Sequence, residues 1–141
     1  MRRYLVVAHR TLGSPELLDA IRDRMAQGPS TFHLLVPEEH GTGMVWDEGQ
    51  VRVDAEHHLE EARVRFLNEG VPVTGEVGKV SPVTATTDLL RREGHGAFAE
   101  IIVSTLPVGA SKWLGMDAPK RIRRITTIPV THIEAASVHV S

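Results

Sequence analysis

The chain lacks cysteine, and it lacks a large excess of charge of either sign. Without cysteine it has no disulfide, no thiolate nucleophile and no thiolate metal site, so its composition suits a reducing compartment. Sixteen basic residues against eighteen acidic ones leave a formal net charge of −2, which provides no field for holding nucleic acid or an anionic membrane. We therefore expect a cytoplasmic protein whose partners include neither nucleic acid nor a membrane.

Long apolar runs are missing as well. The apolar stretch near the start ends at His9, which is too short for a signal peptide or a membrane span. A chain of 141 residues with 41% hydrophobic residues is long enough for one compact core and too short for two ordinary domains. With no internal repeat or linker in view, we predict a single domain over residues 1–141.

Short β-branched stretches alternate with helical patterns, which is the order typical of parallel sheets built through βαβ crossovers. Two helices are predicted to begin at Ser14-Pro15 and Ser81-Pro82, where the serine caps the helix and proline occupies its first turn. Pro129 places the last strand at a sheet edge. Strands are expected at residues 4–8, 31–37, 71–77, 100–104 and 128–135, and the other helices at 55–69 and 117–125.

The longest predicted loop runs from Glu38 to Gln50 and contains three glycines. Met44, Val45 and Trp46 give it an apolar centre. Apolar residues on such a loop could close over a pocket as a lid, and a disordered insertion would have the same composition. The sequence leaves both interpretations open.

Two blocks of sequence, residues 68–94 and the stretch AEIIVSTLPVGASKWLGMDAPKRIRRITTIPVTHI, resemble the universal stress protein family. The resemblance spans nearly the whole chain and implies an adenine-nucleotide alpha-hydrolase-like α/β fold, a doubly wound five-stranded parallel sheet in the order 3-2-1-4-5. In such open sheets a ligand lies at the crevice where the strand order reverses, here between the first and fourth strands. The expected crevice residues are Ala8, His9, Val36, Val103, Ser104, Thr105, Pro107, Gly109, Met116 and Asp117.

Members of the family that bind ATP carry the pattern G-2x-G-9x-G-(S/T) after the fourth strand, and this chain departs from it. Alignment puts Ser104 at the first glycine, Pro107 at the second and Met116-Asp117 at the closing pair. Pro107 lacks an N–H, and Met116 adds bulk where the backbone must approach a phosphate. Asp117 would repel a phosphate charge about 4 Å away by about 1–4 kcal/mol, although it is also explained as a helix cap.

The resemblance, read with these departures, implies a binding or regulatory module that does not bind or hydrolyse ATP in the usual way and needs no cofactor. The alternative is an ATP-binding or other adenine-nucleotide-binding member with a remodelled phosphate loop. The family's habit of pairing, together with the alternating apolar residues of THIEAASVHV, predicts a homodimer through the last strand. The identity of a small-molecule ligand is left open.

Histidines suggest two further sites, and each of them also has a simpler explanation. His9 follows the first strand where ATP-binding relatives usually carry an acidic residue, so it could bond a ligand or simply cap the strand. Zinc needs ligands converging from several directions, whereas the polar face of one helix explains the four candidates Asp54, His57, His58 and Glu61. We predict no metal site. No Ser/His/Asp order or paired carboxylates nominate a catalytic residue, so no enzymatic activity is predicted.

Overall fold

The structure is a computed structural model and describes residues 1–38, 48–79, 81–106 and 118–136. Five parallel strands form one sheet in the order β3-β2-β1-β4-β5. This confirms the predicted α/β class and strand order. The strands are β1 (Arg2–Val7), β2 (Ser30–Pro37), β3 (Val73–Gly78), β4 (Glu100–Thr105) and β5 (Val130–Glu134).

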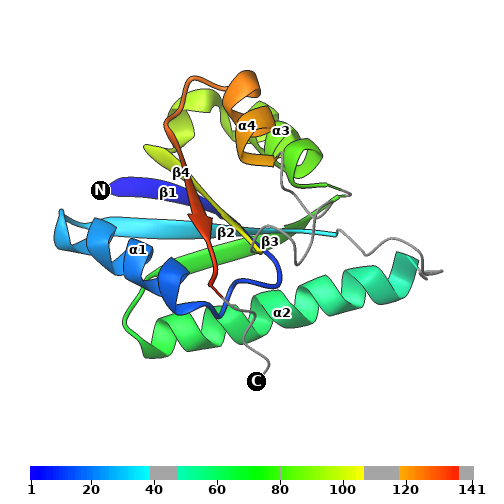
Figure 1. Ribbon diagram of the computed structural model, residues 1–141, viewed down its shortest axis with the longest axis horizontal. Helices are drawn as coiled ribbons and strands as arrows, with labels where there is room; N and C mark the ends of the chain where they lie inside the picture. Colours follow the sequence, from blue (N-terminus) through cyan, green and yellow to red (C-terminus); the bar gives the residue numbers. More distant parts are fainter. Residues whose placement is uncertain (39–47, 80, 107–117, 137–141) are drawn as a thin grey trace.

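Helices cover both faces of the sheet (Figure 1). The first two, α1 (Pro15–Ala26) and α2 (Glu48–Asn68), lie on one face, and α3 (Pro82–Glu93) and α4 (Ala118–Ile125) lie on the other. A short 3₁₀ turn, η1 (His95–Ala97), follows α3 and was not predicted. Within the described ranges, no helix combines the length and the apolar character that crossing a membrane requires.

Both predicted Ser-Pro helix starts are confirmed. The Ser14 hydroxyl accepts a hydrogen bond from the Leu17 amide at 3.2 Å, and the Ser81 hydroxyl accepts one from the Thr84 amide at 3.2 Å. Each bond satisfies one of the backbone N–H groups that the first helical turn leaves without a partner. These caps fix the points at which the chain turns away from the carboxyl ends of β1 and β3.

The core is divided by the sheet into two layers. Alternate residues of β1 point to opposite faces, so Tyr4 and Val6 pack with α1 and α2, whereas Leu5 and Val7 pack with α3 and α4. Since β1 is central and covered on both faces, its residues from Tyr4 onward are all buried. This explains why the strand is a continuous apolar run in the sequence rather than an alternating one.

The structure corrects the predicted loop of residues 38–50, because α2 already begins at Glu48. Its first turns bury Val51 and Ala55, which offsets the roughly 1 kcal/mol that a glycine costs within a helix. Residues 39–47, with the lid and insertion interpretations of Trp46, lie outside the described residues.

The ends of several strands also shift by about two residues from the predicted bounds. The ladder between β1 and β2 extends back to the pair Arg2 and Ser30, two residues before the predicted start of β1. The last strand is shorter than predicted and begins at Val130, directly after Pro129. It lies at the edge of the sheet next to β4, as its proline predicted.

Candidate functional site

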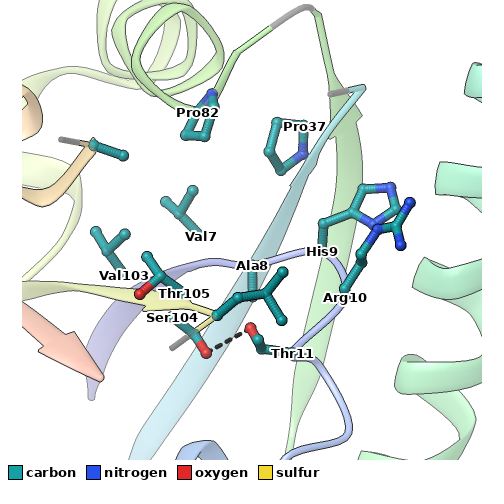
Figure 2. A pocket seen from close by; sticks show the side chains of 12 residues that line it. Val7, Ala8, His9, Arg10, Thr11, Pro37, Pro82, Val103, Ser104 and Thr105 are labelled. Atoms are coloured by element: carbon teal, nitrogen blue, oxygen red, sulfur yellow. Dashed lines mark hydrogen bonds between the residues drawn. The ribbon is translucent and has the colours of Figure 1, made fainter. Parts of the chain in front are cut away.

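A pocket lies at the carboxyl ends of the neighbouring strands β1 and β4, where the strand order reverses (Figure 2). Its walls come from residues 7–11 at the end of β1 and just after it, and from residues 103–106 at the end of β4, together with Pro37 at the end of β2. The first residues of α3 and α4, Pro82 and Ala118, complete the lining. The enclosed volume is about 30 Å³, enough for one or two water molecules, so a larger ligand would extend across the open side. We call this pocket the crevice.

The crevice brings together part of the predicted set. Ala8, His9, Val103, Ser104 and Thr105 line it, as their places at the ends of β1 and β4 led us to expect. Val36 does not, because its side chain is fully buried in the core against the α1 and α2 face. Pro37, the next residue along β2, lines the crevice instead. The remaining predicted residues, Pro107, Gly109, Met116 and Asp117, lie outside the described residues.

Sequence reasoning missed Arg10 and Thr11, which follow His9 in the turn between β1 and α1. Their position between a strand end and a capped helix start was the available signal. Thr11 is 3% exposed, and its hydroxyl forms a 2.6 Å hydrogen bond with the hydroxyl of Ser104 (Figure 2). The bond joins residues 93 positions apart and closes the floor of the crevice. Each buried hydroxyl thereby satisfies the other.

Thr105 is held from the neighbouring edge strand. Its hydroxyl lies 2.6 Å from Nε2 of His132 on β5. Burial lowers the pKa of His132 below its ordinary value of 6.5; the charge of Glu134 raises it, and that of Arg123 lowers it further. With its Nε2 unprotonated, a neutral imidazole can accept a hydrogen bond from the Thr105 hydroxyl. The observed contact fixes the Thr105 side chain in the crevice wall.

His9 extends from the crevice toward α2, where it meets His58. The two Nδ1 atoms lie 3.4 Å apart, and the rings are perpendicular with centroids separated by 4.9 Å. Burial lowers the pKa of His9 to about 4; the charges of His58 and Arg10 act in the same direction, and that of Asp54 opposes them. His9 is therefore neutral at pH 7 and can offer a ligand a hydrogen bond without carrying charge.

The other candidate metal residues of α2 behave partly as a polar helix face. His57 pairs with Glu61 at 2.6 Å, and both side chains are exposed. Asp54 accepts a hydrogen bond from the side chain of Gln50. Within the part of the chain that the structure describes, no group of three or more metal-ligating side chains converges.

Comparison with known proteins gives a match in fold but none in sequence. No family model matches the chain, and neither does any curated protein. A solved universal stress protein in complex with cAMP is 16% identical, with 96% of this chain and 98% of that chain covered and a TM-score of 0.61. A universal stress protein family structure from Burkholderia pseudomallei is 18% identical, with 93% and 94% covered and a TM-score of 0.62.

A third solved structure, a universal stress protein family protein from Arabidopsis thaliana with AMP bound, is 14% identical. The match covers 97% of this chain and 94% of that chain, with a TM-score of 0.63. The chain therefore has the fold of the universal stress proteins over nearly its whole length.

Proposed function

We propose that the chain is a regulatory module of the universal stress protein type that binds a small polar molecule in the crevice and does not hold ATP in the family's usual way. The crevice lies at the switch point between β1 and β4, the position where open α/β sheets bind ligands. Solved structures of the same fold contain cAMP and AMP. These nucleotides carry one phosphate each, which makes them the first ligands to test.

The observation that carries the proposal is the hydrogen bond between Thr11 and Ser104. Ser104 aligns with the first glycine of the ATP-binding pattern, where the family's backbone approaches a phosphate. Here that position carries a side chain that is 7% exposed and bonded at 2.6 Å to Thr11. A phosphate approaching this backbone would have to displace a satisfied buried hydroxyl pair, which costs about 1–3 kcal/mol for each group left without a partner.

The polar groups around this pair suit a ligand of low charge. Arg10 contributes one positive charge to the crevice, and His9 is neutral at pH 7. The hydroxyls of Thr11, Ser104 and Thr105 supply hydrogen bonds without charge. One cation balances a single phosphate better than the several charges of a triphosphate.

Calorimetry with AMP, cAMP and ATP tests the proposal. We expect ATP to bind at least about tenfold more weakly than the better of the two monophosphates, a difference of about 1.4 kcal/mol. Ser104→Gly should reduce this difference in affinity, because it removes the side chain that keeps a phosphate from the backbone. Ser30→Gly is a matched control, because Ser30 is a buried strand serine at the opposite end of the sheet. Equally tight binding of ATP by the wild type would overturn the proposal.

The alternative function is that of an adenine-nucleotide-binding member with a remodelled phosphate loop that still accepts ATP. The solved structures with bound cAMP and AMP favour this alternative, because they have the same fold as this chain and hold adenine nucleotides. Native mass spectrometry of freshly purified protein separates the two. Copurified ATP would support the alternative, whereas a monophosphate or an unrelated small molecule would support the first proposal.

We also propose that two copies pair through β5. This strand lies at the sheet edge, and its residues from Val130 to Glu134 are half-buried or exposed. Such an edge presents unpaired backbone groups to another strand. Sedimentation at tens of micromolar should give a dimer. The Ala135 amide bonds Thr105 of β4, so the preceding residue turns its N–H to the free edge, and a Glu134→Pro variant, which removes that donor, should be monomeric. A monomeric wild type would contradict the pairing.

A further inference from the structure

Two histidines from different elements meet beside the crevice. His9 belongs to the turn after β1, and His58 lies in the middle of α2. Their Nδ1 atoms are 3.4 Å apart, and their rings are perpendicular. We call these two residues the histidine pair.

The separation of the two nitrogens is long for a hydrogen bond and suitable for a shared ion. Hydrogen bonds from nitrogen usually span about 2.7–3.2 Å, so a 3.4 Å contact is a weak one. Two nitrogen ligands of a tetrahedral zinc ion, each about 2.0–2.1 Å from the metal, stand about 3.3–3.4 Å apart. We propose that the histidine pair binds a divalent transition-metal ion of the zinc and copper class through the two Nδ1 atoms.

The surroundings favour a cation at this point. Both histidines are half-buried, and imidazole binds a metal ion through a nitrogen lone pair. Asp54 lies one helical turn before His58, and its negative charge acts on His9. Imidazole nitrogen suits zinc and copper better than magnesium or calcium, which prefer oxygen ligands. Water would fill the remaining coordination positions.

The remaining described histidines are engaged elsewhere. His33 uses both ring nitrogens, with Thr74 at 2.7 Å and Glu76 at 2.8 Å. His57 holds Glu61, and two others bond threonine hydroxyls, His95 with Thr126 and His132 with Thr105. Among the histidines that the structure describes, two imidazoles face each other nitrogen to nitrogen at the histidine pair alone.

Calorimetric titration of the chelator-treated protein with zinc tests the proposal. We expect one ion to bind to the histidine pair and magnesium not to bind there. His58→Gln should weaken this binding by about tenfold or more, since even supporting residues of metal sites are often worth that much. His57→Gln is the matched control, because it removes the neighbouring exposed histidine of the same helix and should leave zinc affinity unchanged.

Copper supplies a second readout that does not depend on affinity. Electron paramagnetic resonance of the copper-loaded wild type should show two coordinating nitrogens, and His58→Gln should show one. Circular dichroism of each metal-free variant establishes that it is folded, and His9→Gln replaces His58→Gln if the latter does not fold. Zinc affinity and copper spectra that are the same in the wild type and in the folded variant would overturn the proposal.

Discussion

Glu100, the first residue of β4, offers the most direct test of how the sheet is fastened to α1. Its carboxylate accepts two hydrogen bonds from Arg24, at 2.8 and 3.1 Å, and one from the Thr131 hydroxyl. The side chains of Arg24 and Glu100 are each 16% exposed. In Glu100→Gln the amide nitrogen cannot accept a hydrogen bond, so one Arg24 donor is left without a partner.

Hydrogen bonds to charged groups contribute about 1.5–3 kcal/mol, and removing one member of a largely buried ion pair leaves the other charge uncompensated. We therefore expect Glu100→Gln to lower the free energy of unfolding by about 2 kcal/mol at pH 7. For a domain of this size that loss corresponds to a fall in thermal midpoint of about 5–8 °C. Urea unfolding followed by circular dichroism measures it.

The effect should depend on pH in a defined direction. Burial raises the pKa of Glu100, but the hydrogen bonds from Arg24 and Thr131 and the charge of Arg24 outweigh it, so the pKa lies below its ordinary value of 4.5. The stabilisation is therefore complete above the unfolded-state pKa and is lost as the pH falls through the lower folded-state value. The difference between wild type and Glu100→Gln should shrink toward pH 3.

Glu60→Gln serves as the control for the Glu100 experiment. It disrupts a comparable pair, with Arg63, on the exposed face of α2 and should change stability very little. A difference between wild type and Glu100→Gln that persists unchanged at pH 3 would refute the charge-based explanation. A loss no larger than that of the control would refute the claim that this network stabilises the fold.

Two further substitutions test packing and the crevice floor. Gly78→Ala would place a methyl group 2.4 Å from Cβ of Ala85, so it should lower the free energy of unfolding, measured by urea titration, by about 1–3 kcal/mol. Gly96→Ala is the control, because its methyl group would meet no atom within 4 Å and should not destabilise the protein. Thr11→Val should cost about 1–3 kcal/mol by leaving the Ser104 hydroxyl unpaired, and adding Ser104→Ala should recover part of that loss; strictly additive losses would show that the two hydroxyls are not coupled.

The fold was predictable because its signals are local. Ser14-Pro15 and Ser81-Pro82 mark helix starts whatever the rest of the chain does. The start of α2 was missed because it depends on tertiary burial. Gly49 favours a loop locally, and the benefit of placing Val51 in the core appears only when the sheet is present.

The candidate site was predictable to the extent that topology determines it. Ala8 and Ser104 line the crevice because the ends of β1 and β4 must meet there. Val36 was expected in the crevice but lies in the core. Neighbouring residues of a strand point to opposite faces, so an error of one residue along β2 selects Val36 in place of Pro37, which does line the crevice. The contact between His9 and His58 depends on the rotation of α2 about its axis, which the 3.6-residue periodicity alone does not determine.

The central place of β1 also governs how the protein is made. This strand is synthesised before both of its partners, and one of them, β4, ends almost 100 residues later, at Thr105. At about 5–20 residues per second, the edge of β1 that β4 will cover stays open for about 5–20 s of synthesis. During that time the nascent chain presents a bare apolar strand edge to chaperones and to other chains. The crevice forms only after β4 has been made, because residues 103–106 supply one of its walls.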